Sequence, residues 1–373
     1  MAADAVTGVA AIGDRAAAVR RDATAEEPST APIRRPVSVG ERDTAVGGGP
    51  AGPRSAVVRA DRTSEMAAGP TGGPPAYASV GSSVSRMTDL DLDPTQLDRY
   101  SRHIIMDDVG PGGQKALLDA EVLVLGAGGL GSPIIQYLAA AGVGTIGIAD
   151  DDEVELSNLQ RQVIHGNDDV GRKKVDSAAE FVAQLNPDVD VRKHELRVTP
   201  ENIEDLIEGY DFVVDGTDNF ATRYLVNDAC TLAGIPFSHG SIFKFEGQVT
   251  TFAGGDDSPC YRCLFPEAPP AGMVPNCSTA GVLGVLPGTV GCLQATETVK
   301  HLIGEGETLD GSMLFFDALE MEFDKVEIPK RDDCPVCGDD PAIESVHDVE
   351  YTASCAIDVG GDDESEPKIE ASD

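Results

Sequence analysis

One segment of this chain constrains its fold more than any other. The apolar run EVLVLG, Glu121–Gly126, continues directly into GAGGLG, Gly126–Gly131, and then into an apolar stretch that ends at Gly142. A short apolar run bounded by glycine is typical of a buried parallel strand. A glycine-rich turn from such a strand into a helix predicts a nucleotide-binding α/β unit. Taken alone, the turn fits a dinucleotide-dependent dehydrogenase equally well.

Strand and helix patterns alternate after this turn. Further strands are predicted over 145–150, 189–196 and 211–216, and helices over 93–106, 171–187 and 219–234. Antiparallel strands are predicted over 247–254, 311–318 and 320–328, with a long apolar segment at 280–303. We therefore expect an α/β fold, with a Rossmann-like, mostly parallel sheet, helices on both faces and an antiparallel C-terminal extension.

The two ends of the chain differ from the middle. Residues 1–86 contain no Leu, Phe or Lys and one aromatic residue, so they cannot bury enough apolar area to fold. We expect a disordered arm or an over-extended reading frame, with Met87 as the true start. Residues 338–373 are acidic and poor in large apolar residues, which predicts a flexible tail. The folded domain is expected at 87–337.

The charge balance excludes several classes of partner. The formal net charge is −36, and nine Lys stand against 64 acidic residues. This argues against binding of nucleic acid and against docking on anionic membranes. No apolar run is long enough to span a membrane, and no signal peptide is visible, so we expect a cytoplasmic protein. The acidic surface suits a salt-rich cytoplasm, although an ordinary acidic protein remains the alternative.

The glycine turn and the next strand predict a nucleotide site. Gly126 permits a tight turn, Gly128 lets the backbone approach a phosphate, and Gly131 permits close packing of helix on strand. Asp150 ends the following strand, where a carboxylate can accept hydrogen bonds from ribose hydroxyls. The alternative for Asp150 is a solvated surface carboxylate.

Cationic and acidic residues further along favour chemistry at a phosphate. Arg161 in SNLQRQ and Lys174 in GRKKV can stabilise charge on phosphate oxygens, which a dehydrogenase does not need here. Asp218 and Asn219 follow a strand in DGTDN, where Asp218 can hold magnesium and Asn219 can bind the nucleotide or a peptide. The alternatives are solvated charges for Arg161 and Lys174 and a helix N-cap for Asp218.

The cysteines form the sharpest pattern. CYRC and CPVC place Cys260, Cys263, Cys334 and Cys337 as two C-x-x-C pairs. Four thiolates suit a closed, tetrahedral, structural zinc site, and two pairs argue against a redox dithiol. Cys277 stands alone in a Gly/Pro-rich stretch, as a nucleophile or an inert thiol. The six His show no metal-binding spacing, so His165 and His239 are expected to be structural.

Eight motifs, in order, resemble those of the MoeB/ThiF family, relatives of ubiquitin-activating enzymes. They span about Leu97 to Gly338: RYSRHI, GAGGLGS, ADDDEVELSNLQRQ, GRKKV, DGTDN, GQVT, CYRC and CPVC. The resemblance implies ATP- and magnesium-dependent adenylation of the C-terminal glycine of a small β-grasp, ubiquitin-like protein with a Gly-Gly tail. The products would be protein conjugates, molybdopterin or thiolated tRNA, and the acidic composition suggests a salt-loving archaeal member.

The resemblance also assigns residues. It implies nucleotide contacts at Gly129, Asp150, Ser157, Asn158, Leu159, Gln160, Arg161, Lys174, Asp218 and Asn219. It implies a homodimer in which Arg102 reaches the phosphates of the neighbouring subunit, and it matches Cys277 to a position that forms a thioester or persulfide in some members. Some members of the family carry a C-terminal rhodanese domain as the sulfur donor, and the 36 residues after Cys337 are too few for such a domain. We therefore expect sulfur to come from a separate donor protein. An NAD-dependent oxidoreductase and a non-catalytic zinc-stabilised scaffold remain the alternatives.

Overall fold

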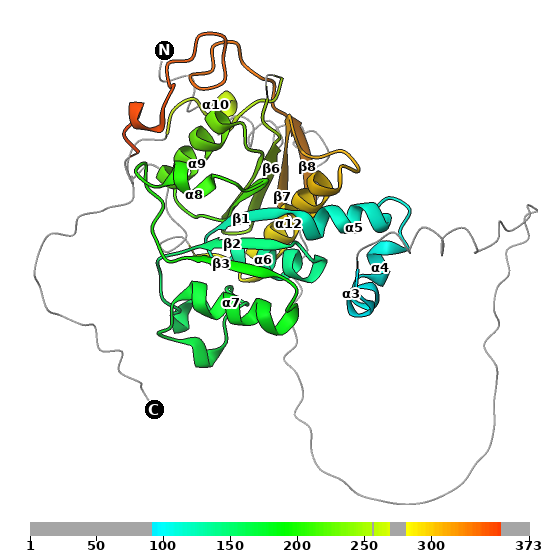
Figure 1. Cartoon of the computed structure of the whole chain (residues 1–373). Coiled ribbons are helices and arrows are strands. Elements are labelled where there is room, and N and C mark those ends of the chain that lie inside the picture. The colour runs from blue at the N-terminus through cyan, green and yellow to red at the C-terminus, as the bar shows by residue number, and fades with distance from the viewer. Residues whose placement is uncertain (1–91, 256, 269–280, 352–373) are drawn as a thin grey trace, which may run out of the picture. The chain divides into compact units, whose positions relative to one another are not determined.

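The computed structural model describes residues 92–255, 257–268 and 281–351. The expected extension over 1–86, Met87 and Cys277 lie outside these residues. Within them, eight strands form one sheet in the order β3-β2-β1-β4-β5-β6-β7-β8 (Figure 1). The strands are β1 Glu121–Leu125, β2 Thr145–Ala149, β3 Asp190–His194, β4 Phe212–Asp215, β5 Phe237–Phe243, β6 Glu246–Phe252, β7 Ser312–Asp317 and β8 Glu322–Glu327.

The sheet has a parallel half and an antiparallel half. Strands β1 to β5 pair in parallel, and β6, β7 and β8 pair antiparallel. In register, Leu125 of β1 lies beside Ala149 of β2 and Asp215 of β4, and Asp215 lies beside His239 of β5. The carboxyl ends of the parallel strands therefore form one edge, where open α/β sheets bind ligands. The predicted fold class, with its antiparallel extension, is confirmed.

Helices cover both faces because alternate residues of β1 point to opposite sides. Val122 and Val124 pack into a core with α6, α7 and α12, while Leu123 and Leu125 pack into a second core with α8 and α9 (Figure 1). The described helices are α3 Pro94–Arg99, α4 Ser101–Ile104, α5 Gly110–Asp119, α6 Gly131–Ala141, α7 Lys174–Leu185, α8 Ile203–Ile207, α9 Phe220–Ala233, α10 Tyr261–Leu264 and α12 Val285–Ile303.

The structure differs from the predicted elements in two places. The helix predicted over 93–106 is interrupted at Tyr100, whose buried hydroxyl accepts a hydrogen bond from Asn186 at 2.9 Å. Within the apolar segment at 280–303, residues Val285–Ile303 form α12. Residues 338–351, which the sequence predicts to be part of a flexible tail, pack on the protein, with Ile343 and Val346 buried. Packed structure therefore continues beyond Cys337, as far as Tyr351.

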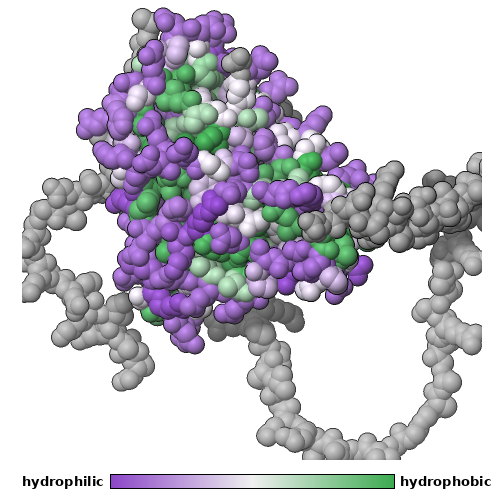
Figure 2. All heavy atoms as spheres, viewed as in Figure 1, coloured by the Kyte–Doolittle hydropathy of each residue, from purple (hydrophilic) through white to green (hydrophobic). Residues whose placement is uncertain are grey.

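Hydrophilic residues predominate on the face shown in Figure 2, with smaller apolar groups between them. This agrees with the acidic composition of the chain. Among the residues that the structure describes, no helix is both long enough and apolar enough to cross a lipid bilayer.

Candidate nucleotide site and cysteine cluster

The glycine turn joins β1 to α6 at the carboxyl edge of the sheet. Gly126 has φ of +93°, a conformation that glycine adopts without the strain of a side chain. A Cβ at Gly131 would overlap the carbonyl oxygen of Gly126, so glycine is required at this position too. The turn thus brings the N-terminus of α6 against the end of β1. Free N–H groups and the helix dipole make such an N-terminus favourable for a phosphate.

Asp150 and Lys174 lie next to this turn. One carboxylate oxygen of Asp150 accepts a hydrogen bond from Ala127 N at 2.8 Å, which ties the end of β2 to the glycine turn. Lys174 begins α7, and its buried ammonium nitrogen lies 2.7 Å from Asp152 and 3.9 Å from Asp150. The surface-charge alternative does not apply to Lys174, because its side chain is 5% exposed.

The SNLQRQ segment folds back on the glycine turn. The half-buried Arg161 donates to the carbonyl of Ser157 at 3.3 Å, and its Cγ would lie 3.6 Å from a Cβ at Gly129. Asn158 is buried, Leu159 is half-buried, and Ser157 and Gln160 are exposed. This segment also packs on the start of α12, where Gly284 leaves room for the carbonyl of Gln160. A mixed surface of side chains and backbone therefore borders the glycine turn.

The DGTDN segment forms the other border. Gly216 N donates to Leu125 O at 2.9 Å, and Gly216 O would lie 3.1 Å from a Cβ at Gly126. Asp218 is exposed, without a hydrogen bond or ion pair to any described residue. The N-cap role considered for Asp218 belongs to Asn219, whose side chain accepts from Thr222 N at 2.9 Å. The carboxylate of Asp218 is thus left available to a ligand.

His165 supports the turn from behind and was not predicted to touch the site. Its Nε2 donates to Ala127 O at 2.9 Å, and its Nδ1 accepts from the Ser177 hydroxyl at 2.8 Å. Burial lowers the pKa of His165, and this neutral tautomer satisfies both partners. Sequence spacing carries no signal for this contact, because the two bonded segments are far apart along the chain.

Two predicted residues are not found among the described contacts of the glycine turn. Arg102 lies exposed on α4, next to α5, and it has no hydrogen bond or ion pair among the described residues. Cys277 falls outside the described residues.

The two C-x-x-C pairs are far apart in the sequence but lie together in the structure. The sulfur atoms of Cys260, Cys263, Cys334 and Cys337 all lie within 4.8 Å of one another. Cys260 and Cys334 are 3.5 Å apart, and Cys263 and Cys337 are 3.4 Å apart. A tetrahedral ion with metal–sulfur bonds of about 2.3 Å spaces its ligands by about 3.8 Å. Hydrogen bonds among the four thiols lower the pKa of Cys263 and Cys334 and raise that of Cys260 and Cys337. The spacing of the four sulfur atoms is what fits a metal ion.

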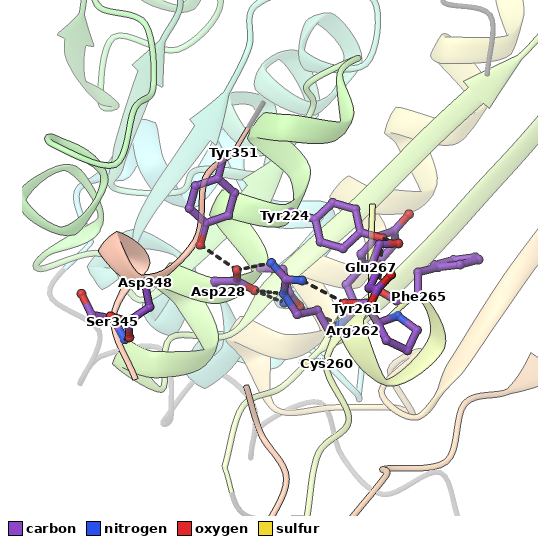
Figure 3. A network of polar contacts seen from close by, with 12 residues as sticks. Tyr224, Asp228, Cys260, Tyr261, Arg262, Phe265, Glu267, Ser345, Asp348 and Tyr351 are labelled. Atoms are coloured by element: carbon purple, nitrogen blue, oxygen red, sulfur yellow. Dashed lines mark hydrogen bonds and ion pairs between the residues drawn. The ribbon is translucent and has the colours of Figure 1, made fainter. Parts of the chain in front are cut away.

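A buried ion pair ties this cluster to α9 (Figure 3). Arg262, between the first two cysteines, donates to both oxygens of Asp228 at 2.7 and 2.6 Å. The hydroxyl of Tyr351 donates to the same carboxylate at 2.7 Å. Asp228 is fully buried, so these donors replace the water that it loses. Tyr351 and the turn that carries the first two cysteines are therefore both held by the Asp228 side chain of α9.

Comparison with known proteins decides the family. The model of the ThiF family matches residues 100–336, which include all eight strands of the sheet and three of the four clustered cysteines. The chain belongs to the ThiF family. The predicted relationship is thereby confirmed, and the ThiF match covers both sides of the glycine turn.

Individual ThiF relatives agree. The chain is 61% identical over 268 residues to a SAMP-activating enzyme E1 of Haloferax volcanii, covering 72% of this chain and 98% of that protein. It is 49% identical over 266 residues to a sulfur carrier protein adenylyltransferase of Thermus thermophilus, covering 70% and 97%. It covers 59% of a pig adenylyltransferase and sulfurtransferase, MOCS3, at 47% identity over 269 residues, which is 72% of this chain.

Solved structures show the same fold. The crystal structure of Escherichia coli MccB superposes with a TM-score of 0.59 at 22% identity, over 67% of this chain and 75% of that one. At this identity the match supports the fold of the ThiF domain and no finer property.

Proposed function

We propose that this protein uses ATP to adenylate the C-terminal glycine of a small, ubiquitin-like β-grasp protein. The observation that carries the proposal is the gathering of four segments around one glycine turn, with Lys174, Arg161 and Asp218 on its borders. The names of the two full-length relatives, an activating enzyme and a sulfur carrier adenylyltransferase, support the same activity.

The chemistry follows from the charges at the site. The partner's terminal carboxylate attacks the α-phosphorus of ATP, a new P–O bond forms, and the bond to the bridging oxygen breaks, so that pyrophosphate leaves. Lys174 and Arg161 stabilise the charge that accumulates on the phosphate oxygens. The carboxylate is ionised near pH 7, so this step needs no general base.

Magnesium fits the donor set. Mg²⁺ prefers carboxylate and phosphate oxygens, and the exposed, unpaired Asp218 offers such an oxygen beside the turn. Asp218 would hold the ion, whose charge would help to neutralise the phosphates. Asp150 would bind the ribose, and Gly128, Gly129 and the 157–160 segment would contact the nucleotide.

Zinc is the metal that we propose for the cysteine cluster. It favours four thiolates in a closed tetrahedral site, and such a site stabilises the fold. The cluster lies at the start of the segment that leads toward Cys277, so zinc would hold that end of the segment.

We also propose a homodimer in which Arg102 acts at the partner's site. Arg102 is exposed and unpaired among the described residues, and its neighbours Ile105 and Met106 are 66% and 49% exposed. Leu156 and Val163, on either side of the Arg161 segment, are 68% and 57% exposed. Apolar groups beside both parts of the site fit a subunit interface that brings them together. Light scattering should give the mass of a dimer; a monomer that adenylates at full rate contradicts this arrangement.

The adenylated partner protein is then used for protein conjugation, or for sulfur transfer in the synthesis of molybdopterin or thiolated tRNA. We propose that in conjugation the Cys277 thiolate attacks the acyl carbon of the adenylate, so that a thioester forms and AMP leaves, and that a separate donor protein supplies sulfur for sulfur transfer. Cys277→Ser should leave adenylation intact and abolish a thiol-sensitive adduct. Unchanged conjugation by this variant contradicts the role. The acidic, lysine-poor composition supports action in the cytoplasm of a salt-rich cell.

Pyrophosphate exchange tests the function. An adenylating enzyme returns labelled pyrophosphate to ATP only when its small protein is present. Hydride transfer to NAD without such exchange would favour an oxidoreductase. Nucleotide-independent binding of the small protein would favour a scaffold.

A further inference from the structure

The turn that carries Asp218 is shaped by one buried carboxylate. Asp215, the last residue of β4, is 1% exposed. Its Oδ1 accepts hydrogen bonds from Thr217 N at 3.0 Å and from the Thr217 hydroxyl at 2.7 Å. The Asp215 carbonyl accepts from Gln294 on α12 at 2.8 Å. The first residues of the DGTDN turn are thus folded around the side chain of Asp215.

The second oxygen of this carboxylate is held by His239. His239 lies beside Asp215 in the register of β4 and β5, and its Nδ1 is 2.9 Å from Oδ2. His239 is also 1% exposed. A carboxylate oxygen accepts, so Nδ1 carries the hydrogen. Burial raises the pKa of Asp215, but the interactions with His239, Arg223 and Thr217 together lower it below its usual value. Burial and the charge of Arg223 lower the pKa of His239. The pair is therefore a neutral imidazole bonded to a carboxylate.

We propose that His239 is a positioning residue of the adenylation site. By holding Asp215, it keeps the Gly216–Thr217 backbone against the glycine turn and keeps Asp218 facing the phosphates. This inference rests on the proposed function, because it assigns Asp218 to the bound nucleotide and its metal ion. It departs from the expectation that His239 is merely structural.

The cysteine cluster supports His239 from its other side. The ring of Tyr261, from the CYRC turn, packs edge-on against the imidazole with centroids 5.1 Å apart. Arg223 lies nearby and bonds to the hydroxyl of Tyr261 at 3.4 Å. Asp215, Arg223 and Tyr261 are thus the charged and titratable groups around His239. The Nε2 of His239 has no hydrogen-bond partner among the described residues, so the bond to Asp215 is the one hydrogen bond of these residues that orients the ring.

Three variants separate positioning from simple stability. His239→Leu keeps the volume but removes the donor, whereas His239→Asn places an amide nitrogen close to the position of Nδ1. His301→Leu is the matched control, because His301 packs on Phe212 at the opposite end of β4, with centroids 5.0 Å apart, and does not touch the turn.

Calorimetric binding of ATP with Mg²⁺ is the readout, with thermal unfolding measured in parallel. We expect His239→Leu to weaken binding by about tenfold, the scale of a lost hydrogen bond to a buried charge. His239→Asn should recover most of the affinity, and His301→Leu should bind as the wild type does. Equal affinities for His239→Leu and His301→Leu overturn the inference.

Thr217→Val provides a second route if His239→Leu does not fold. This variant removes the hydroxyl that donates a hydrogen bond to Oδ1 of Asp215. Weaker binding of ATP with Mg²⁺ supports the inference, and unchanged binding overturns it. Pyrophosphate exchange by the wild type reports the proposed function separately. Intact ATP binding without exchange contradicts adenylation, whereas the comparison of variants tests the positioning role.

Discussion

The ammonium nitrogen of Lys174 lies 2.7 Å from a carboxylate oxygen of Asp152, yet the two side chains are 5% and 66% exposed. The cation is therefore fixed inside the protein, while its partner stands at the surface. A phosphate can replace the exposed carboxylate without displacing the lysine. This arrangement pre-positions positive charge where the proposed reaction develops negative charge.

Lys174→Ala should reduce pyrophosphate exchange by about 10²- to 10³-fold, since one such group is worth this much in other active sites. Lys173→Ala is the matched control, because the neighbouring lysine pairs with Glu153 and Glu195 at the surface. Comparable losses in the two variants would show that general charge, and not the buried ammonium, supports the reaction.

His165 should make stability depend on pH. Its pKa is lowered by burial, so below about pH 6.5 the unfolded chain binds a proton that the folded protein does not. The free energy of unfolding should therefore fall as the pH drops from 7.5 to 5.5. His165→Gln should cost about 1–3 kcal/mol at pH 7.5 and make the pH dependence shallower.

His347→Gln is the control for this experiment, because His347 is exposed. Urea unfolding at both pH values measures the effect. An equally steep pH dependence in wild type and His165→Gln contradicts the assignment of this group.

The fold was largely predictable because its strands are apolar and its turns are marked by glycine. The helix predicted from residue 93 does begin there, with Asp93 as its N-cap, and the apolar stretch that ends at Gly142 forms α6, which Gly142 caps. The break at Tyr100 was not predictable, because it depends on Asn186 far along the chain. The docking of Tyr351 on Asp228 escaped prediction for the same reason. Local patterns report periodicity, whereas these contacts depend on the completed packing.

The candidate site, like the fold, was predictable from the sequence only in part. Lys174 and Arg161 were found from motifs, since phosphate chemistry needs cations near a glycine turn. The bonds of His165 and His239 connect segments whose sequences give no sign of contact.

The cysteine cluster should lose metal and stability together. The Cys260→Ser/Cys334→Ser double variant should contain less than one zinc per chain and unfold at a lower temperature, because zinc binding contributes to folding. Cys292→Ser, a half-buried thiol on α12, should change neither property. Full zinc content in the double variant, by elemental analysis, contradicts the site.

Arg262→Met should lower the free energy of unfolding by about 3–5 kcal/mol, because it leaves Asp228 buried without its charged partner. Arg331→Met is the control, since its ion pair with Asp333 is exposed and should be worth at most about 1 kcal/mol. Urea unfolding distinguishes the two. A similar small loss in both variants would mean that Asp228 is adequately solvated or bonded without Arg262.

The mass of the small partner protein tests the central claim most directly. After incubation with this protein, ATP and Mg²⁺, mass spectrometry should show the partner carrying one AMP at its C-terminal glycine. Removal of that glycine, or Lys174→Ala in this protein, should abolish the adduct, whereas Lys173→Ala should preserve it. A partner whose mass never changes, in the presence of a folded, ATP-binding wild-type protein, contradicts adenylation.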